Sequence, residues 1–277
     1  MFKITQKINL NEAVTQMTFF APAVAKKAMA GQFVVLRVEE KGERIPLTIS
    51  HSDVKTGEIT VVFQVVGDTT KELNSIAQGG YITDLAGPLG VPTKIDEKLE
   101  RVCVVGGGVG NAIAYAVANA FKQKGVKVDL ISGYRTKDLV IMCDELKSAC
   151  QDFFLVTDDG SAGEKGFVTT KLEALIESGV RYGEVFAVGP VVMMRAVSNL
   201  TKKYGIKTTV SLNPIMVDGI GMCGCCRVTV NGKVKFACVD GPDFDAHGVD
   251  FDNLVKRNNM YEGHKKPHVC NLTGELK

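Results

Sequence analysis

The feature that most restricts the fold of this chain is a regular alternation of apolar strands and helices between Arg101 and Leu212. Its first strand, Arg101–Val105, is almost continuously apolar, as expected for a strand buried on both faces of a parallel sheet. Five strands joined by four crossover helices predict an open, doubly wound α/β sheet. The other expected strands are Lys127–Ser132, Phe153–Thr157, Glu184–Val188 and Lys207–Leu212, and the expected helices are Ala112–Phe121, Asp138–Ser148, Val168–Ser178 and one that begins near Val191.

A glycine-rich loop, Gly106–Gly110, connects the first strand of this region to its first helix. Glycines allow a phosphate to approach the backbone closely, and the N-terminus of the following helix favours an anion. The loop is not a strict G-x-G-x-x-G motif, because Asn111 stands at the third glycine position. The strand, loop and helix together indicate nucleotide binding.

Glycine and polar residues recur where the strands of this region end, which is where doubly wound sheets bind ligands. The segments are Gly133–Arg135, Asp158–Ser161 and the Gly189-Pro190 pair. Arg135 could hold the 2′-phosphate of NADP or pair with the adenosine phosphates. Because the neighbouring carboxylates of Asp158 and Asp159 would repel an additional phosphate, we expect NAD.

The first hundred residues follow a different pattern, in which short apolar strands are separated by turn residues. Several short strands at this spacing predict a small antiparallel β-barrel. The expected strands are Lys3–Leu10, Val14–Phe20, Phe33–Val38, Ile45–Ser50, Glu58–Val66 and Tyr81–Leu85. The run Arg44–Ser50 contains a proline followed by a small hydroxyl residue, which suits a hydrogen-bonding surface and equally an ordinary edge strand.

One helix, Thr69–Ala77, is expected to interrupt these strands just after Gly67. Asp68 or Thr69 would be its N-cap. The N-terminus of this helix would suit a pyrophosphate. An ordinary capped helix explains the same residues, and the local sequence does not separate the two interpretations.

Three cysteines and one aspartate lie close together near the end of the chain. They are Asp218, Cys223, Cys226 and Cys238, with four, two and eleven residues between successive members. Iron–sulfur clusters are held by about four protein ligands, usually thiolates, on a backbone that directs N–H groups at the sulfides. Gly219, Gly221 and Gly224 would let the chain turn sharply around such a cluster. This composition predicts an iron–sulfur site.

Two other interpretations of these cysteines remain. A zinc site would use Cys223 and Cys226 with Cys238 and a fourth ligand such as Cys270 or His268. Free cysteines that merely fill space are the second alternative. Cys225 is an additional thiol next to the predicted ligand set.

Composition excludes several classes of function. The 277 residues include 33 basic and 31 acidic ones, so the net charge of +2 gives no reason to expect a nucleic-acid or membrane-surface partner. The sequence has no apolar stretch of about 18 residues and no signal-peptide core at its N-terminus. Eight cysteines without an export signal favour metal or redox roles over disulfides. We expect a cytoplasmic protein.

Taken in order, these segments resemble the ferredoxin–NADP reductase superfamily, in which a flavin-binding β-barrel precedes a nicotinamide-binding α/β domain. The segments that carry the resemblance are Pro46–Ile49 for the flavin motif, Gly87–Gly90 for the domain junction, and Gly106–Gly110, Gly133–Arg135 and Gly189–Met193 for the nicotinamide domain. The arginine of the flavin motif stands one place early, as Arg44, because Ile45 is inserted.

The cysteine spacing is similar to the C-x4-C-x2-C-x11-C loop of the dihydroorotate dehydrogenase electron-transfer subunit, with Asp218 in place of the first cysteine. That aspartate, together with the run Ala237–Pro242, resembles the family of small subunits of NADH-dependent ferredoxin:NADP oxidoreductase, also called sulfide dehydrogenase. The resemblance covers essentially the whole chain and depends most on the cluster loop.

The resemblance implies an FAD-binding β-barrel at 1–97, an NAD(P)-binding α/β domain at 98–212 and a 2Fe-2S subdomain at 213–277. It implies hydride exchange with NAD(H) through FAD, and transfer of single electrons through the 2Fe-2S cluster to a larger partner subunit. That partner would carry a flavin, 4Fe-4S clusters and an NADP(H) site, and would react with ferredoxin by electron bifurcation. No acid–base catalytic residue is expected in this chain.

The resemblance also assigns residues to each site. The implied FAD-binding residues are Pro46, Leu47, Thr48, Ile49, Phe63, Gln64, Val65, Gly67, Thr69 and Thr70. The implied NAD-binding residues are Gly107, Gly108, Val109, Gly110, Asn111, Gly133, Arg135, Asp159, Gly189, Pro190 and Met193. The implied metal ligands are Asp218, Cys223, Cys226 and Cys238.

Three alternatives remain for the whole chain. A dihydroorotate dehydrogenase electron-transfer subunit shares nearly every feature but normally has cysteine at position 218. A stand-alone ferredoxin reductase would need no cluster loop of its own. The alternative from a different class is a zinc-stabilised nucleotide-binding or sensor module.

Two further segments near the end of the chain could contribute to binding. His264, His268 and Cys270 have approximate metal spacing in the tail. The acidic segment Gly241–Asp252 is compatible with a partner surface.

Overall fold

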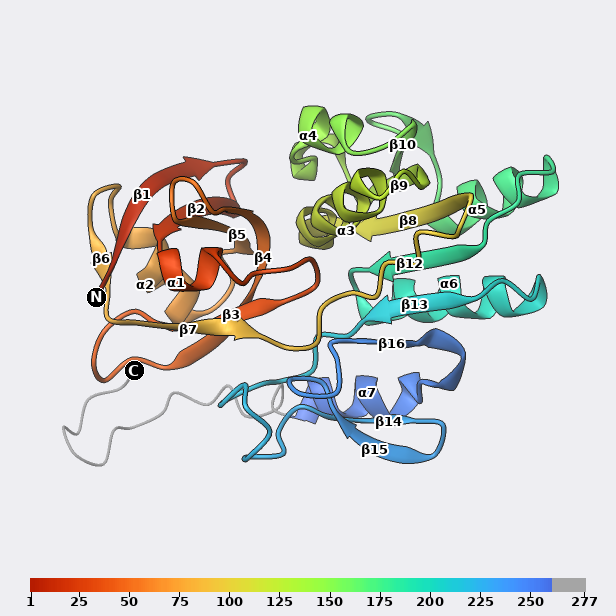
Figure 1. The fold of residues 1–277 in the computed structure, drawn as a ribbon. Coiled ribbons are helices and arrows are strands. Elements are labelled where there is room, and N and C mark those ends of the chain that lie inside the picture. The colour runs from red at the N-terminus through yellow and green to blue at the C-terminus, as the bar shows by residue number, and fades with distance from the viewer. Residues whose placement is uncertain (261–277) are drawn as a thin grey trace.

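The computed structural model describes residues 1–260 and contains two large sheets and a small hairpin (Figure 1). The N-terminal sheet is antiparallel and almost closes into a barrel, with the strand order β6-β1-β2-β5-β4-β3-β7. Its strands are β1 (Phe2–Asn9), β2 (Val14–Phe20), β3 (Phe33–Arg37), β4 (Arg44–Asp53), β5 (Glu58–Gln64), β6 (Tyr81–Ile82) and β7 (Asp84–Leu89). The predicted β-barrel is confirmed.

Alternation of residue types along the barrel strands explains its core. In β2, Met17 and Phe19 point into the barrel and are fully buried, because successive side chains of a strand face opposite sides. Ile59 and Val61 of β5 complete the same interior. The barrel therefore has a hydrophobic core of its own.

Three details of the barrel region differ from the sequence prediction. The expected strand Tyr81–Leu85 is two strands, because Thr83 lies between β6 and β7. A short helix, α1 (Pro22–Ala25), was not expected. The helix after the glycine is α2 (Asp68–Ser75), and its N-cap is Gly67 rather than Asp68 or Thr69.

The second sheet contains the five expected strands in parallel, in the order β10-β9-β8-β12-β13 within a seven-stranded sheet. The parallel strands are β8 (Arg101–Gly107), β9 (Lys127–Tyr134), β10 (Asp152–Thr157), β12 (Glu184–Val188) and β13 (Thr208–Ser211). The crossover helices are α3 (Asn111–Gln123), α4 (Cys143–Ser148), α5 (Val168–Glu177) and α6 (Val191–Lys203). This order confirms the doubly wound α/β prediction.

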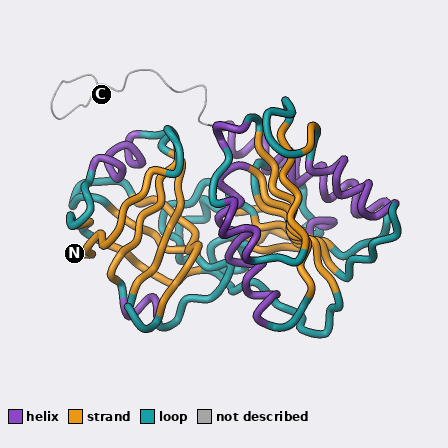
Figure 2. The backbone as a smooth tube through the Cα atoms, turned by 90° about the horizontal axis from the view of Figure 1, so that it is seen from above, coloured by secondary structure: helices purple, strands orange, loops and turns teal. Residues whose placement is uncertain are grey.

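Both faces of this sheet are covered by helices, as Figure 2 shows from above. Helices α3 and α4 pack on one face, and α5 and α6 pack on the other. The expected helix Asp138–Ser148 was wrong in extent, because a 3-10 turn, η2 (Lys137–Leu139), precedes α4. Met142 separates the two, with a left-handed φ of 55° that a continuous helix cannot accommodate.

Two strands that were not expected extend the parallel sheet. At one edge, β11 (Glu164–Lys165) pairs with β10. At the other edge, β16 (Asp243–Asp245) pairs antiparallel with β13. The hydrogen-bonded sheet therefore continues beyond residue 212, and the domain boundaries at 97 and 212 stay a prediction.

The C-terminal part lies below the parallel sheet in Figure 1. It consists of the hairpin β14 (Arg227–Val230) and β15 (Lys233–Phe236), the edge strand β16, the 3-10 turn η3 (Ala246–Gly248) and helix α7 (Phe251–Asn258). Its core is continuous with one face of the parallel sheet and with Phe33 and Val35 of the barrel. In residues 1–260, no helix has the length and apolar character needed to span a bilayer.

Candidate nucleotide and iron–sulfur sites

The glycine-rich loop lies between β8 and α3, where Gly108–Gly110 forms a 3-10 turn, η1. Glycine is required here by close backbone approaches. A Cβ atom on Gly110 would lie 2.6 Å from the carbonyl oxygen of Val188, and one on Gly189 would lie 3.0 Å from the Cα of Gly107. The ends of β8 and β12 therefore touch through backbone alone.

Asn111 is completely buried and its side chain holds the loop from below. Its Oδ1 accepts a hydrogen bond of 2.7 Å from Ser132 Oγ, and its Nδ2 donates to the carbonyls of Gly108 at 3.0 Å and Gly133 at 3.5 Å. These bonds tie the loop to the end of β9. The predicted binding residue Asn111 is thus located where its side chain orders the loop.

The remaining predicted NAD-binding residues also follow the carboxyl ends of the parallel strands. Met193 and Pro190 lie against Gly107, since a Cβ on that glycine would approach Met193 Sδ to 2.5 Å and Pro190 Cδ to 3.0 Å. Arg135 and Asp159 are exposed and adjacent, because Asp159 N–H donates to the Arg135 carbonyl at 3.4 Å. Hydrogen bonds from Ser161 lower the pKa of the Asp159 carboxyl.

The predicted FAD residues lie on β4, at the end of β5 and around the start of α2. Pro46, Leu47 and Thr48 are half-buried in the middle of β4, and Ile49 is buried. The side chain of Phe63 is buried inside the barrel, so only its backbone is available to a ligand. Gln64 beside it is exposed.

The turn before α2 is held by a side-chain hydroxyl. Thr70 Oγ1 accepts hydrogen bonds of 3.0 Å from the backbone N–H groups of both Val66 and Gly67. Thr69 is buried, and its hydroxyl donates to Glu43 at 3.1 Å. The N–H groups of Val66 and Gly67 thus have a partner within the chain, and a Cβ added at Gly67 would meet no atom within 4 Å.

The structure brings the two nucleotide-type sites together. Strand β4 lies against α3, and η1 lies against β5. Val62 of β5 shares a hydrophobic cluster with residues of α3 and β8. The candidate FAD strands and the glycine-rich loop therefore face each other across the junction of the barrel and the parallel sheet.

The cysteine-rich loop has no regular secondary structure between Ile220 and Cys226, and its conformation depends on Asp218. The Asp218 carboxylate accepts backbone hydrogen bonds from Ile220 at 2.9 Å, Met222 at 3.1 Å and Cys223 at 2.6 Å. The bond from Ile220 is the largest of several that lower the pKa of Asp218. This carboxylate shapes the loop as well as being a predicted ligand.

The four predicted ligands form two pairs. Asp218 and Cys223 are adjacent at the surface, and the backbone N–H of Cys225 lowers the pKa of the Cys223 thiol. Cys226 and Cys238 are buried with their sulfurs 3.2 Å apart. Burial, followed by the neighbouring Cys226, raises the pKa of Cys238 to about 12.

In residues 1–260, no three His, Cys, Asp or Glu side chains converge on one point closely enough to hold a single metal ion. The two pairs nevertheless suit a two-iron cluster, because each iron of such a cluster takes two protein ligands. The left-handed backbone of Gly219, Gly221 and Gly224 forms the tight loop that a cluster requires. The residues present therefore fit a 2Fe-2S cluster.

The cluster loop rests against the barrel. Gly219 is buried, and a Cβ at this position would lie 2.7 Å from Val35 Cγ2 of β3 and 3.1 Å from Leu89 Cδ1 of β7. Only glycine permits this contact at a φ of 74°. The predicted ligand Asp218 is thereby located beside the flavin-type barrel.

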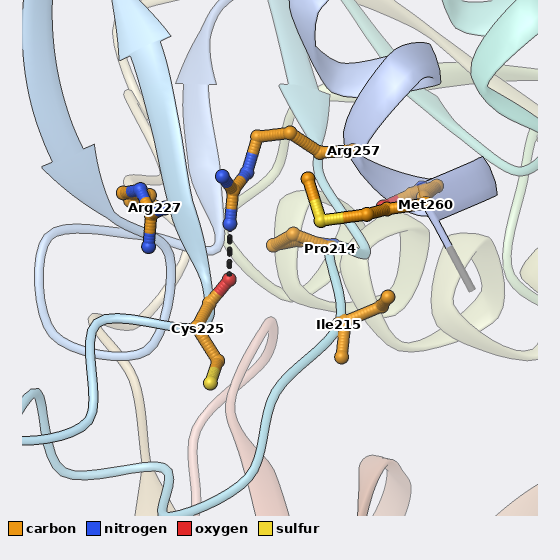
Figure 3. A pocket seen from close by; sticks show the side chains of 7 residues that line it. Pro214, Ile215, Cys225, Arg227, Arg257 and Met260 are labelled. Atoms are coloured by element: carbon orange, nitrogen blue, oxygen red, sulfur yellow. Dashed lines mark hydrogen bonds between the residues drawn. The ribbon is translucent and has the colours of Figure 1, made fainter.

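Sequence reasoning missed two arginines that contact this loop. Arg227 Nη1 donates to the Gly224 carbonyl at 2.9 Å, and Arg257 Nη2 donates to the Cys225 carbonyl at 3.1 Å (Figure 3). The second contact spans 32 residues, so no local pattern indicates it. The tail residues His264, His268 and Cys270 lie outside the described part of the chain, and so does the zinc alternative that needs them.

Residues 213–250 match a family described as the iron-sulfur cluster binding domain of dihydroorotate dehydrogenase B. A Thermotoga maritima protein, named dihydroorotate dehydrogenase B (NAD(+)), electron transfer subunit homolog, is 47% identical over 264 residues, which are 95% of this chain and 93% of the relative. The electron transfer subunit of Fusobacterium nucleatum dihydroorotate dehydrogenase B (NAD(+)) is 33% identical over 80% of this chain and 87% of the relative. This chain belongs to the family of dihydroorotate dehydrogenase B electron-transfer subunits and their homologues.

A solved structure of NADH-dependent reduced ferredoxin-NADP oxidoreductase is 44% identical, with a TM-score of 0.91 over 96% of this chain and 95% of that chain. The ferredoxin reductase in carbazole 1,9a-dioxygenase, 19% identical with a TM-score of 0.64, covers 74% of this chain and 64% of its own and shares the fold. The predicted resemblance to the small subunits of NADH-dependent ferredoxin:NADP oxidoreductase is confirmed. This family member is an electron-transferring oxidoreductase subunit, and its relatives support FAD, an iron–sulfur cluster and NAD(H) as cofactors.

Proposed function

We propose that this chain is the small subunit of an NADH-dependent reduced ferredoxin:NADP oxidoreductase. It exchanges hydride with NAD(H) through FAD and passes single electrons through a 2Fe-2S cluster. The acceptor is a larger partner subunit that carries a flavin, 4Fe-4S clusters and an NADP(H) site and reacts with ferredoxin. Division into an FAD-binding unit at 1–97, an NAD(P)-binding unit at 98–212 and a cluster-binding unit at 213–277 is part of the proposal.

One observation carries this choice within the family, namely an aspartate at the first position of the cluster motif. The carboxylate of Asp218 organises the backbone up to Cys223, as a residue at the cluster would be expected to do. The similarity at a TM-score of 0.91 to an oxidoreductase described in terms of flavin-based electron bifurcation supports the same choice.

Each cofactor has a distinct chemical task in this proposal. When bound, FAD connects two-electron hydride exchange with one-electron transfer, and the cluster carries single electrons. Asp218, Cys223, Cys226 and Cys238 would hold the cluster. An aspartate is a harder and less covalent donor than a thiolate, so it changes the electron density at the iron and with it the reduction potential of the cluster.

The residues of this chain bind and orient the nucleotides. Gly107–Gly110 and the N-terminus of α3 would face the phosphates of NAD(H), and Asn111 keeps that loop in place through Ser132 and Gly133. Gly133, Arg135, Asp159, Gly189, Pro190 and Met193 complete the proposed NAD site. Arg135 and Asp159 at the outer edge would contact the adenosine end.

The FAD site is proposed on the barrel. The backbone of Pro46–Ile49 and of Phe63–Val65 would line the flavin on the side that faces α3 and η1. Gly67, Thr69 and Thr70 would bind its pyrophosphate at the first turn of α2. Because β5 lies against η1, the flavin and the nicotinamide would be bound on either side of this contact.

The proposal is tested on anaerobically purified protein. We expect about two irons and two sulfides per chain, a flavin spectrum that NADH bleaches, and the EPR signal of a reduced 2Fe-2S cluster. Replacing Asp218 with Cys should keep the cluster and change its potential. An unchanged potential would count against aspartate ligation, and zinc without sulfide would exclude the electron-transfer role of the loop.

The similarity to the Thermotoga maritima and Fusobacterium nucleatum relatives favours a second candidate, an electron-transfer subunit of dihydroorotate dehydrogenase B. The two candidates differ in their partner subunit. Isolation of the native complex followed by assay distinguishes them. A dihydroorotate dehydrogenase complex should reduce NAD with dihydroorotate, whereas a ferredoxin:NADP oxidoreductase complex should use NADPH to reduce NAD and oxidised ferredoxin together.

A further inference from the structure

The two halves of the cysteine-rich loop are held in different ways. In the first half, three backbone N–H groups bond to the carboxylate of Asp218. In the second half, the carbonyls of Gly224 and Cys225 accept hydrogen bonds from the guanidinium groups of Arg227 and Arg257. A positive charge therefore lies on each of two consecutive peptide carbonyls between the ligands Cys223 and Cys226.

Arg257 differs from Arg227 in its support. Arg227 is exposed and bonds a carbonyl three residues away, so solvent and salt weaken its effect. Arg257 is half-buried and reaches the loop from the last turn of α7, across a gap in the sequence of 32 residues. Figure 3 shows its side chain extended toward the Cys225 carbonyl, beside a cavity of about 90 Å³.

Helix α7 is a firm base for this contact. Phe251 and Leu254 are buried in the core that also contains Cys226 and Cys238. The Asp250 carboxylate caps the helix by accepting a hydrogen bond of 2.9 Å from the N–H of Asn253. The guanidinium of Arg257 is therefore supported by the same core as the buried cysteine pair.

A second contact joins α7 to α6, which packs on the parallel sheet. Arg195 Nη1 of α6 lies 3.0 Å from Asp252 Oδ1 of α7. None of the ion pairs formed within residues 1–260 includes Arg257. Within that range, no carboxylate pairs directly with this guanidinium, and its hydrogen bond goes to the Cys225 carbonyl.

We infer that Arg257 is a positioning residue for the iron–sulfur cluster and raises its reduction potential. Its bond to the Cys225 carbonyl fixes the backbone that spaces Cys223 from Cys226. Its positive charge favours the reduced cluster, which carries one more negative charge than the oxidised one, since net charge and nearby hydrogen bonds set cluster potentials. The inference rests on the proposed function in that it requires the cluster.

The test is a redox titration of the cluster, monitored by EPR, in the purified full-length protein. Arg257→Gln removes the charge, Arg257→Lys keeps it, and Lys256→Gln is the matched control because it removes an exposed charge from the same turn of α7. We expect Arg257→Gln to lower the midpoint potential by an amount on the order of a tenfold change in the one-electron equilibrium, which is 59 mV. Arg257→Lys and Lys256→Gln should remain close to the wild type.

Iron content and flavin absorbance of each variant keep the outcomes separate. A potential of Arg257→Gln equal to that of Lys256→Gln, with full iron content, would overturn the inference. If Arg257→Gln loses iron while its flavin spectrum is retained, the positioning role is supported and Arg257→Lys decides the electrostatic part. Iron content and a potential near those of the wild type in Arg257→Lys uphold the electrostatic part. Loss of iron from Arg257→Lys overturns it. Absence of iron and sulfide from the wild type would instead contradict the proposed function.

Discussion

The glycine-rich loop after β8 and the cysteine-rich loop before β14 are both built from glycines, but they are held in opposite ways. The first lies at the carboxyl end of the central strand β8, where Asn111 and the backbone of Gly189 enclose it. The second rests against the barrel and is shaped by the carboxylate of Asp218 and by arginines of β14 and α7. The glycine-rich loop is thus ordered by the sheet to which it belongs, whereas the cysteine-rich loop depends on side chains and on packing against a different part of the fold.

The difference follows from what each site must bind. Backbone N–H groups and a helix N-terminus suffice for a phosphate, and the sheet supplies both without cost to its own hydrogen bonds. Thiols must lose their protons to become thiolate ligands, and burial opposes this loss until a metal compensates the negative charge. The raised pKa of Cys238 shows this opposition in the described structure.

The largest expected effect is a loss of iron at the cysteine-rich loop that leaves nucleotide binding at the glycine-rich loop unchanged. Cys226→Ser should abolish nearly all iron and sulfide binding, because serine replaces a buried thiol of the proposed ligand set. Flavin content and NADH binding should remain, since the glycine-rich loop has no contact with this thiol. Iron and sulfide analysis with fluorescence titration of NADH checks both parts. Cys225→Ser is the control, and a loss of iron only in that variant would assign the ligand role to Cys225.

A smaller effect is expected from crowding the glycine-rich loop. Gly110→Ala should destabilise the folded state by about 3 kcal/mol, because its Cβ would lie 2.6 Å from the Val188 carbonyl oxygen and neither backbone can move freely. Gly108→Ala has open space and only a φ of 56° to oppose it, so it should cost about 1 kcal/mol. Urea denaturation of both variants measures the difference. Equal stabilities would mean that the loop is not rigid.

The stability of the folded protein should depend on pH through Asp243, which contacts the segment between β7 of the barrel and β8 of the parallel sheet. Asp243 of β16 is half-buried as a residue, but its carboxyl end is enclosed. Thr93 Oγ1 donates to its Oδ2 at 2.6 Å, while Oδ1 has no partner within residues 1–260. Burial raises the pKa of this carboxyl from 3.8 to about 6.

Because folding raises this pKa, protonated Asp243 stabilises the folded protein and the benefit is lost as the pH rises through about 6. Asp243→Asn should therefore gain stability relative to the wild type by about 2 kcal/mol between pH 4 and pH 8. Thermal unfolding of both proteins across this range, with Asp245→Asn as an exposed control, measures the change. A difference that does not vary with pH would show that Asp243 does not titrate near 6.

The smallest expected effect lies within the cysteine-rich loop. Gly219 and Gly224 both have left-handed backbone, but a Cβ on Gly219 would meet Val35 at 2.7 Å and one on Gly224 would only touch Phe236 at 3.6 Å. Gly219→Ala should therefore be about 1 kcal/mol less stable than Gly224→Ala and lose iron faster. The rate of iron release to a chelator compares the two. Equal rates would mean that the loop does not rest on the barrel in solution.

Much of the fold follows from local sequence pattern. The alternation of strands such as Val102–Val105 with helices such as the small-residue helix after Asn111 predicted the parallel sheet, and the short strands separated by turn residues in the first hundred residues predicted the barrel. The errors occur where one residue interrupts a pattern, as Met142 does with its left-handed φ. Strand β16 was missed because three residues carry too little periodicity and pair only through contact with β13.

A buried charge network shows the same limit at the other end of the sheet. Asp129 lies fully buried in β9, and only the structure shows its partners, Arg101 at 2.8 Å and Tyr182 at 2.6 Å. Burial raises the pKa of Tyr182, so its hydroxyl remains a donor to the carboxylate. Such partners lie 28 and 53 residues away, and the sequence around Asp129 does not identify them.

The sequence by itself determined the alternating strands and crossover helices of the parallel sheet, the glycine-rich turn and the residue types of the cysteine-rich loop, because these depend on side-chain period and local backbone freedom. Tertiary structure decided which of these segments meet. It placed β5 against η1, Gly219 against β3 and Arg257 on the Cys225 carbonyl. These contacts arise from the packing of whole elements, which depends on the combined shape of surfaces far apart in the chain and leaves no trace in any short segment.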